Sequence, residues 1–573
     1  MLRLVKPTSW FPIVGQLANY SPDKLYSDSL AALLVTVILI PQSLAYAILA
    51  GLPPHYGLYA SILPLIVYAL FGTSSVLGVG PVAIASIMTA SVLSSVVATG
   101  QVSHAQGAFT LAFLSGSILL VMGLLRLGFV SHFLSHSVIS GFMTASGLII
   151  ALAQFRPLLG INTIGNTFVE LLVQTMYSLR QVNIPTAILG VSTVLFLLLA
   201  KRCAAKTLQK YGLSHSVSTL IARMAPIVAV TACTLMVAGF NLNEQGVAIV
   251  GDIPTGIAHL SWPDWQWSVV KTLLMPAFFI SMIGYFESIS VGKTLGAKKG
   301  ERINPNQEFI ALGGANLASG LVGAFPVTGG FSRSVVNLDA GAKTQMAGVY
   351  TAVCIAISSL FLTPYLFYIP LPTLAATIFV AVLSLIDLAI FKKAWRFSKS
   401  DFVALCITLF LTLIAGVEAG VASGIVVSIL LHVYRTSKPH IAELGLLVGT
   451  PHFRNVKYYQ VEQIPHVLSL RIDESLIFSN VNYLEKYILD ALAQRSSLRH
   501  IVLHCGSVNS VDLSGLEMLK RINAHLIKHH IQLHLSELKT PVKMLLDKTS
   551  FLSELSGTIY MTHLQAHEAL QQS

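Results

Sequence analysis

Charged residues are scarce in this sequence. Only 11% of the 573 residues are Asp, Glu, Lys or Arg, whereas soluble domains usually carry about 25%. The shortage is concentrated before residue 436, where apolar runs follow one another almost without pause. A run of about 20 apolar residues is what a helix needs to cross a ~30 Å hydrocarbon core. The composition therefore excludes a soluble enzyme and predicts a polytopic membrane protein.

Other features are missing as well. The five cysteines show neither a pairing pattern nor the spacing of a metal site. The first twenty residues lack an apolar stretch followed by a small-residue cleavage site, so we expect no cleaved signal peptide. No nucleotide-binding loop is present that would indicate an ATP-driven pump. We expect no metal and no cofactor.

The positive charge is distributed unevenly. The net charge of +11 collects in three loops of the membrane region, at residues 201–210, 293–302 and 392–399, whereas residues 241–267 contain no Lys or Arg. This is the positive-inside pattern, and it predicts that the three loops face the cytoplasm. The basic charge thus reports membrane topology and does not indicate a nucleic-acid partner. We expect a multi-pass protein of the inner (plasma) membrane with both termini in the cytoplasm.

About fourteen spans are predicted. They lie near residues 28–52, 55–72, 80–98, 107–127, 134–155, 183–200, 216–239, 268–290, 307–323, 332–341, 348–366, 371–390, 401–416 and 419–435.

Two of these spans begin at irregular backbone. One follows Gly78–Pro81 and the other follows Thr328–Phe331, and β-like stretches precede them at residues 71–76 and 325–328. Matching interruptions in two halves predict an inverted repeat with a binding site near the membrane midplane. We place the repeats at about 28–239 and 268–435, with seven spans each. The alternative is that Gly and Pro are simply common in membrane helices.

The C-terminal part has the composition of a soluble α/β domain. Residues 467–471, 500–504 and 531–535 are predicted strands, and residues 480–493 and 514–530 are predicted helices. We place this domain at 451–573, a transmembrane domain at 1–435 and a linker at 436–450. His525, His529, His530 and His534 could suggest a metal site, but histidines on solvated helix faces explain them more simply.

Arg333 is the strongest candidate for anion binding. It lies just inside the second interrupted helix between Ser332 and Ser334. An Arg at membrane depth costs about 2.5–3.5 kcal/mol on insertion scales, so it is rarely without a role. Two helix N-termini of roughly +0.5 each and one guanidinium give a charge of about +2, which suits a dianion. A structural ion pair is the alternative.

Polar residues in two other spans are further candidates. Gln42, Ser43 and Tyr46 surround Pro41 in the first span, where polar groups need a partner or an aqueous cavity. A packing helix kinked by the proline is the alternative. Glu287 lies in the eighth span. Burial and a nearby anion both disfavour a charged carboxylate, which makes Glu287 a candidate proton carrier. A surface-facing glutamate at a helix end is the alternative.

The motifs together resemble the SulP sulfate-permease family. The run Pro41–Tyr59 resembles its signature, and Thr328–Asn337 followed by Ala340–Thr344 is similar to the plant-type sulfate transporters. The resemblance implies a 7+7 inverted-repeat fold with core and gate domains, an elevator motion and a homodimer. It also implies a substrate site between the third and tenth spans.

The same resemblance assigns roles by position. Gln42 and Tyr46 would line the site from the first span. The helix N-termini would be supplied by Val82 and Ala83 in the third span and by Ser332, Arg333 and Ser334 in the tenth. Glu287 matches the proton-coupling glutamate of plant-type members, whereas sodium-coupled bicarbonate members have an Asp in that span.

The C-terminal domain resembles a STAS domain, with Val511–Gly515 as its diagnostic loop. Anti-sigma-factor antagonists carry a phosphorylatable hydroxyl directly after the Asp of this loop, and here that residue is Leu513. A phosphorylation switch is therefore disfavoured, and an interaction or trafficking role with an unknown cytoplasmic partner is expected.

We interpret the chain as a secondary transporter that couples sulfate uptake to protons. Moving a dianion inward against about 100 mV costs roughly 4.6 kcal/mol, so accumulation needs a co-transported cation or an exchanged anion. The alternatives are an anion exchanger or channel, and a sodium- or proton-coupled transporter of bicarbonate or a C4-dicarboxylate. A membrane-anchored regulator would leave the two broken helices and Arg333 unexplained.

Overall fold

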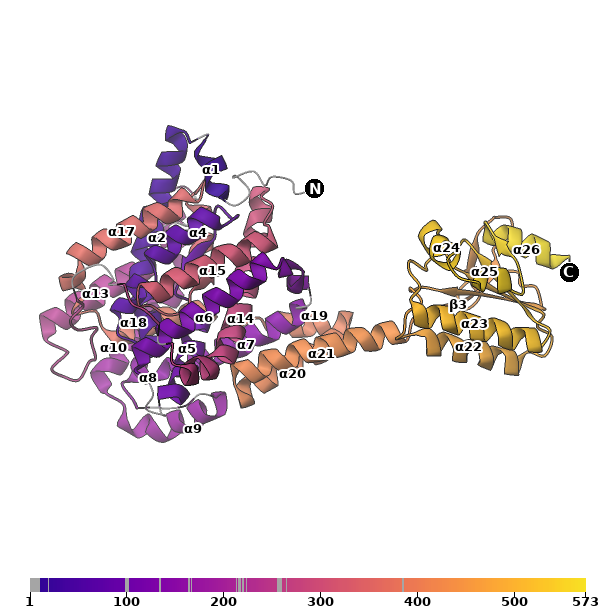
Figure 1. Cartoon of the computed structure of the whole chain (residues 1–573). Helices are drawn as coiled ribbons and strands as arrows, with labels where there is room; N and C mark the ends of the chain where they lie inside the picture. Colours follow the sequence, from indigo (N-terminus) through magenta and orange to yellow (C-terminus); the bar gives the residue numbers. More distant parts are fainter. Residues whose placement is uncertain are drawn as a thin grey trace. The chain divides into compact units, whose positions relative to one another are not determined.

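The computed structural model describes residues 11–572, apart from residues 19, 98–101, 133–134, 163–164, 166, 213, 215–217, 219–220, 223, 255–259, 264 and 384–385; a few helical side chains, including that of Ser332, also lie outside the description. The chain forms two compact units that divide between Ser428 and Ile429 (Figure 1).

The first unit is built almost entirely of helices. Its longer helices are α2 (Pro22–Leu49), α4 (Leu63–Phe71), α5 (Ala83–Val97), α6 (His104–Leu124), α7 (His136–Ala153), α9 (Phe168–Ser178), α10 (Ile184–Leu199), α13 (Ala225–Phe240), α14 (Trp267–Lys299), α15 (Pro305–Leu321), α16 (Phe331–Asp339), α17 (Met346–Phe361), α18 (Leu371–Val382), α19 (Ala389–Phe397), α20 (Lys399–Ala415) and α21 (Val417–Ser437). Among the described residues, six helices are long and apolar enough to cross a membrane, and five shorter helices are apolar.

Short helical pieces complete this unit. They are α1 (Pro12–Leu17), α3 (His55–Tyr59), α8 (Phe155–Leu159) and α11 (Ala205–Lys210), the 3-10 turns Leu127–His132, Leu179–Gln181 and Thr363–Leu366, and a π-helical turn at Ala200–Ala204.

Most predicted spans coincide with a helix, but several boundaries differ. The span predicted at 55–72 is split into α3 and α4, and the one at 371–390 corresponds to α18, which already ends at Val382. The predicted span 268–290 continues as α14 to Lys299, because no residue after Ser290 breaks the helix until Gly300 ends it with a φ of 72°. Parts of the spans at 80–98, 134–155, 216–239 and 371–390 fall outside the described residues.

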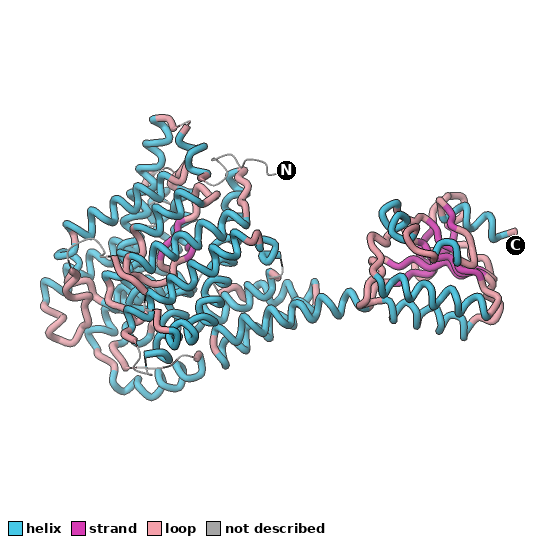
Figure 2. The backbone as a smooth tube through the Cα atoms, viewed as in Figure 1, coloured by secondary structure: helices cyan, strands magenta, loops and turns pink. Residues whose placement is uncertain are grey.

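A two-stranded ribbon lies among these helices (Figure 2). Strands β1 (Gly78–Gly80) and β2 (Thr328–Gly330) pair in antiparallel fashion, with Gly78 opposite Gly330 and Gly80 opposite Thr328. The predicted β-like stretches at 71–76 and 325–328 are therefore wrong in position by several residues. The ribbon forms at the glycines themselves, where no side chain obstructs close pairing.

Helices α6 and α15 pack with their backbones close together (Figure 1). A Cβ atom on Gly116 would lie 2.5 Å from the backbone nitrogen of Leu317, and one on Gly313 would lie 2.7 Å from that of Leu120. Small residues permit such close helix contacts within a membrane. This contact joins a helix from each predicted repeat and fixes the framework around the ribbon.

The second unit is an α/β domain around one mixed sheet. Its elements are β3 (Ile441–Leu446), β4 (Phe453–Asn455), β5 (Val467–Ile472), α22 (Val481–Gln494), β6 (His500–His504), α23 (Leu513–Lys528), β7 (Gln532–Ser536), α24 (Thr540–Leu546), α25 (Phe551–Glu554), β8 (Ile559–Tyr560) and α26 (His563–Gln571).

The sheet has the order β4-β3-β5-β6-β7-β8, with parallel pairing from β5 to β8. The three predicted strands and two predicted helices are present with small shifts of their ends. Strand β3 lies within 436–450 and pairs with β5. That segment is therefore not a plain linker, because part of it belongs to the sheet.

Several histidines are buried between the sheet and α26. His534 is only 2% exposed on β7, so its expected place on a solvated helix face is wrong, whereas His525, His529 and His530 are exposed as expected. The amide of Thr558 donates to Nδ1 of His534 (2.9 Å), and Nε2 of His534 lies 3.1 Å from Nδ1 of His500. Because Nδ1 of His534 accepts a hydrogen bond, the proton of this neutral ring lies on Nε2.

Acidification should loosen this part of the domain. Burial lowers the pKa of His534 to about 4 and that of His563, on α26, to about 3. Above the unfolded-state pKa of about 6.5 the rings are neutral in both states and do not change the free energy of unfolding. As the pH drops from there toward the folded-state pKa values, the free energy of unfolding falls by up to about 1.4 kcal/mol per pH unit for each histidine. We expect hydrogen-exchange protection factors of α26 to fall about tenfold or more between pH 7.5 and pH 5.5.

The variant His563→Gln should remove a large part of this pH dependence. His529→Gln, at an exposed position, should leave it unchanged and serves as the matched control. Equal protection factors of α26 at the two pH values would contradict the assignment of neutral buried rings.

Candidate functional site

Two helices of the membrane unit begin directly at the ribbon. Helix α16 starts at Phe331 beside Gly78, and α5 starts at Ala83, three residues beyond Gly80. Because the strands are antiparallel, the two N-termini lie at opposite ends of the ribbon. The first amides of a helix have no intrahelical partner and carry a partial positive charge. No side chain caps α16, which leaves its first turn available to an anion.

The side chain of Arg333 lies along the ribbon. A Cβ atom on Gly78 would be 2.9 Å from Cγ of Arg333, and one on Gly80 would be 2.9 Å from its Nη1. A Cβ atom on Gly330 would likewise lie 2.8 Å from Nε of Arg333. These glycines leave the space that the arginine occupies. The guanidinium thereby extends from the start of α16 toward the start of α5.

Most donors of this guanidinium are engaged by backbone carbonyls. Nε donates to the carbonyl of Gly78 (2.9 Å), and Nη2 donates to those of Pro81 (2.8 Å) and Thr328 (3.3 Å). Nη1 is buried and has no hydrogen-bond partner in the described part of the chain. A buried unpaired donor on a charged group is costly unless a ligand satisfies it. The arginine therefore joins the two strands and keeps one nitrogen without a hydrogen-bond partner among the described residues.

Glu287 is the second residue with an unsatisfied polar atom here. Its Oε2 is buried without a partner, and the side chain lines a 20 Å³ cavity whose other lining residues are all apolar. Tyr46, Glu287 and Arg333 interact electrostatically with one another. Residues from α2, α14 and α16, far apart in the sequence, are thus brought to one place.

Two other buried carboxylates differ from Glu287 because donors surround them. Asp28 accepts from the amides of Lys343 (2.6 Å) and Thr344 (3.1 Å) and from the hydroxyls of Thr344 and Tyr20. Asp28 therefore fastens α2 to the loop that follows α16.

Glu308 does the same for the segment that leads into β1. It accepts from the hydroxyl of Tyr68 (2.9 Å) and from the amide and hydroxyl of Thr73. Farther along, Asn337 donates to the carbonyl of Val76 (3.2 Å). A carboxylate on α15 and an amide on α16 thus position residues 73–76.

The segment that leads into β2 is held by uncharged groups. Asn316 makes a two-point contact with Val327: its Nδ2 donates to the carbonyl (2.8 Å), and its Oδ1 accepts from the amide (2.9 Å). Ser288, next to Glu287 on α14, accepts from the amide of Gly329 (2.8 Å) and bonds to the hydroxyl of Thr328 (2.7 Å). The ribbon and the proton-carrier candidate are therefore attached to the same turn of α14.

The residues predicted for the site are found in different environments. Tyr46, Val82 and Ala83 are buried, Gln42 is partly buried on α2, and Ala83 is the first residue of α5. The hydroxyl of Ser43 bonds to that of Ser61 (2.7 Å).

Ser334 also has internal partners. Its hydroxyl donates to the carbonyl of Gly330 (2.6 Å) and accepts from the amide of Gly78 (2.9 Å). Both Ser43 and Ser334 therefore contribute to packing and to the ribbon. The side chain of Ser332 lies outside the described residues.

Sequence reasoning missed the residues that hold the site together. Asn316, Ser288 and Glu308 contribute through hydrogen bonds to backbone that is distant in sequence, and no local pattern signals them. Gly78, Gly80 and Gly330 were noted as interruptions, but their role as the surface under Arg333 depends on strand pairing. The signal that could have suggested it is the coincidence of glycines in both interrupted segments.

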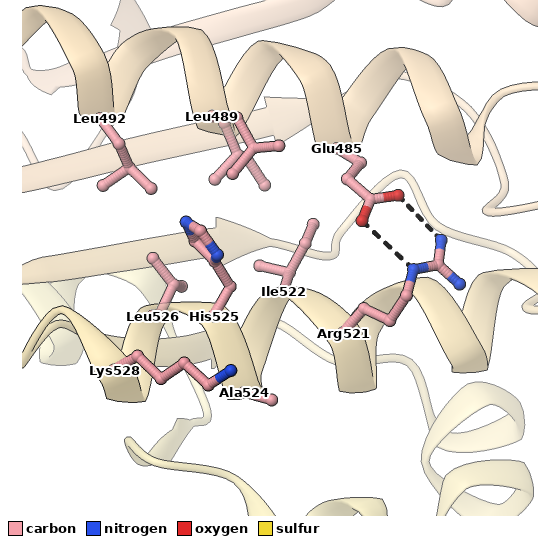
Figure 3. A pocket seen from close by; sticks show the side chains of 10 residues that line it. Glu485, Leu489, Leu492, Arg521, Ile522, Ala524, His525, Leu526 and Lys528 are labelled. Carbon is pink, nitrogen blue, oxygen red and sulfur yellow. Dashed lines mark hydrogen bonds and ion pairs between the residues drawn. The ribbon is translucent and has the colours of Figure 1, made fainter.

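The second unit offers a groove between α22 and α23 (Figure 3). It has a volume of about 340 Å³ and is lined mainly by aliphatic side chains such as Leu489, Leu492 and Ile522. At one end Arg521 donates to both carboxylate oxygens of Glu485 (2.8 and 3.2 Å). The pair satisfies its own charges, so the groove has little chemistry to offer a small polar ligand. In the described part of the chain no group of three His, Cys, Asp or Glu residues could hold a metal ion.

The loop at the start of α23 is well ordered by its aspartate. Asp512 accepts from the amides of Gly515 (2.8 Å) and Phe478 (2.7 Å) and so caps the helix. Leu513, which follows, is exposed. The loop therefore presents an apolar side chain where a phosphorylatable hydroxyl would be needed.

Comparison with known proteins now decides the family. The profile of the Sulfate permease family matches residues 25–408, and that of the STAS domain matches residues 458–566. The chain belongs to the sulfate permease family. It is 33% identical to "Sulfate transporter 4.1, chloroplastic" of Arabidopsis thaliana over 98% of this chain and 82% of that protein. It is also 31% identical to a probable sulfate transporter of Mycobacterium tuberculosis over the full length of both chains.

Solved structures of family relatives have the same fold. The murine Solute Carrier 26 family member A9 anion transporter matches with a TM-score of 0.89 and 25% identity, over 98% of this chain and 94% of the other. The transmembrane domain of a cyanobacterial bicarbonate transporter matches with a TM-score of 0.60 and 23% identity, over 69% of this chain and 98% of that domain. The fold is the predicted one, a fourteen-span inverted repeat followed by a STAS domain.

The glycine surface under Arg333 can be tested directly. Gly78→Ala places a methyl group against Cγ of Arg333 and should displace the guanidinium. We expect binding of labelled sulfate to weaken about 10- to 100-fold, the range for loss of a hydrogen bond to a charged group. Arg333→Ala should have an effect at least as large.

Gly348→Ala is the matched control, because a Cβ atom there meets only an ordinary contact of 3.7 Å with Leu65. It should bind sulfate like the wild type. If Gly78→Ala bound sulfate normally while Arg333→Ala did not, the arginine would not depend on the ribbon surface.

Proposed function

We propose that this protein is a secondary transporter that moves sulfate together with protons across the cytoplasmic membrane. The observation that carries the proposal is the pair of buried, unpartnered polar atoms, Nη1 of Arg333 and Oε2 of Glu287. A cationic donor without an acceptor suits an anion, and a carboxyl oxygen without a donor suits a proton. Curated relatives named as sulfate transporters support sulfate as the anion.

The charge at the site favours a doubly charged oxyanion. Arg333 contributes one full positive charge, and the N-termini of α5 and α16 contribute about half a charge each. A tetrahedral dianion between them would accept from backbone amides and from Nη1 of Arg333, as anions do at helix N-termini. Tyr46 approaches from α2, and Gln42 is the further polar group that this helix offers.

Glu287 supplies the coupling in this proposal. Because Oε2 has no hydrogen-bond partner among the described residues and the other residues that line the cavity are apolar, a proton is the simplest partner for that oxygen. Loading sulfate adds negative charge close to Glu287, which favours its protonated form. Proton and sulfate would thereby bind together, and their joint movement offsets part of the electrical cost of moving a dianion inward.

Several further properties belong to the same proposal. The transmembrane domain comprises residues 1–435, with repeats at about 28–239 and 268–435. The substrate moves by an elevator motion of a core domain against a gate domain, and the protein acts as a homodimer in the inner (plasma) membrane. Both termini and the STAS domain, from about residue 451, are cytoplasmic. The STAS domain binds a cytoplasmic protein partner.

The central prediction concerns Glu287→Gln in proteoliposomes. The amide keeps the size of the side chain but carries no proton to be released. We expect the variant to retain exchange of labelled for unlabelled sulfate and to lose at least about 90% of the uptake driven by an inward proton gradient, because a neutral amide cannot couple the two. Asp401→Asn, an acid-to-amide change in the first turn of α20, is the control.

Competition by unlabelled anions is part of the same measurement. Stronger competition by bicarbonate or a C4-dicarboxylate than by sulfate would mean that the protein is a transporter whose main substrate is that anion. Undiminished gradient-driven uptake by Glu287→Gln would remove the proton-coupling role of this residue. Sulfate flux through the wild type that does not change with the proton gradient would mean that the protein is an exchanger or a channel.

A further inference from the structure

Helix α19 (Ala389–Phe397) is a short basic helix that was not predicted as a separate element. It connects α18 and α20, two of the membrane helices, and packs against α20 and α7. Ala394 is buried against these helices, whereas Lys392, Lys393 and Arg396 are exposed. Its neighbours in the chain thus hold α19 at the end of the helix bundle, with its basic side outward.

The exposed side of α19 is a shallow hollow of about 440 Å³. Five residues line it: Ala389, Lys392, Lys393, Arg396 and Phe397. Their spacing of three and four residues places them on one face of the helix. Three cations therefore line one shallow hollow together with Ala389 and Phe397.

The charges of this face are not neutralised within the protein. Among the ion pairs of the described residues, none includes Lys392, Lys393 or Arg396. Of the two acids nearest in the chain, Asp387 accepts from the amides of Ala389 (2.9 Å) and Ile390 (3.3 Å) at the start of the helix, and Asp401 lies in the first turn of α20. The face thus keeps three positive charges available for a ligand.

Large apolar side chains flank these cations. Phe397 is 90% exposed, Leu388 is 69% exposed and Trp395 is 57% exposed. Trp395 is anchored from the other side, since its ring meets that of Phe402 on α20 edge-on at 4.9 Å. Aromatic rings next to Lys and Arg are typical of helices in the membrane–water interface, where rings enter the acyl boundary and cations reach the headgroups.

We propose that α19 binds the headgroups of anionic phospholipids, with Lys392, Lys393 and Arg396 around the lipid phosphate and Phe397 and Trp395 among the acyl chains. The complementary charge selects an anionic lipid over a zwitterionic one, and the exposed rings select a lipid over a free phosphate ion. Such a contact holds the connection between α18 and α20 in the plane of the membrane surface. It is independent of the transported anion.

The test uses tryptophan quenching in the full-length protein. Four of the five tryptophans, at positions 10, 262, 265 and 267, are changed to Phe so that Trp395 is the remaining fluorophore. The protein is reconstituted in phosphatidylcholine containing 10% phosphatidylglycerol, with bromine carried either by the phosphatidylglycerol or by an equal amount of phosphatidylcholine. We expect brominated phosphatidylglycerol to quench about threefold more or better, given the attraction of each Lys or Arg to anionic lipid.

Three variants complete the experiment. Changing Lys392, Lys393 and Arg396 together to Gln should abolish the difference in quenching between the two brominated lipids. Changing the two lysines to Arg and the arginine to Lys should preserve that difference. Changing Lys201, Arg202 and Lys206 to Gln removes three charges elsewhere in the unit and should also preserve it. Equal quenching by the two brominated lipids in the protein that keeps all three basic residues of α19 would overturn the proposal. A preference for brominated phosphatidylglycerol that survives when all three are changed to Gln would overturn it as well.

Discussion

The structure depends on one buried cation, the guanidinium of Arg333, held against the backbone of a two-stranded ribbon. Three carbonyl groups, those of Gly78 on β1, Thr328 on β2 and Pro81 just after β1, accept its hydrogen bonds. A charge at this depth would be costly without them. The glycines at 78, 80 and 330 are required because the arginine occupies the space of their absent side chains. The same residue thus ties the two interrupted helices together and leaves one nitrogen for a ligand.

The buried carboxylates divide into two kinds around this centre. Asp28 and Glu308 are saturated by backbone and hydroxyl donors, and each fastens a segment that flanks one of the interrupted helices. Glu287 has an oxygen without a donor and apolar neighbours. Asp28 and Glu308 thus hold segments next to the two interrupted helices in place, whereas Oε2 of Glu287 has no hydrogen-bond partner among the described residues.

Much of this architecture could be predicted from the sequence, because hydropathy and paired interruptions are local signals. Arg333 and Glu287 were identified from their chemistry at membrane depth. The ribbon was misplaced because strand pairing between residues about 250 positions apart is not a local property. Ser43 and Ser334 were expected in the substrate site, but their hydroxyls bond within the protein. His534 was expected to be solvated, but it is buried on β7, because burial depends on the sheet and on α26.

The most direct test of the account is the number of protons taken up when sulfate binds. Titration calorimetry of the purified protein in buffers of different ionisation enthalpy gives this number for the wild type and for Glu287→Gln. Linkage between an anion at Arg333 and the carboxyl of Glu287 predicts an uptake that approaches about one proton per bound sulfate in the wild type and is near zero in the variant. Sulfate binding without proton uptake by the wild type, or equal uptake by both proteins, would contradict the account.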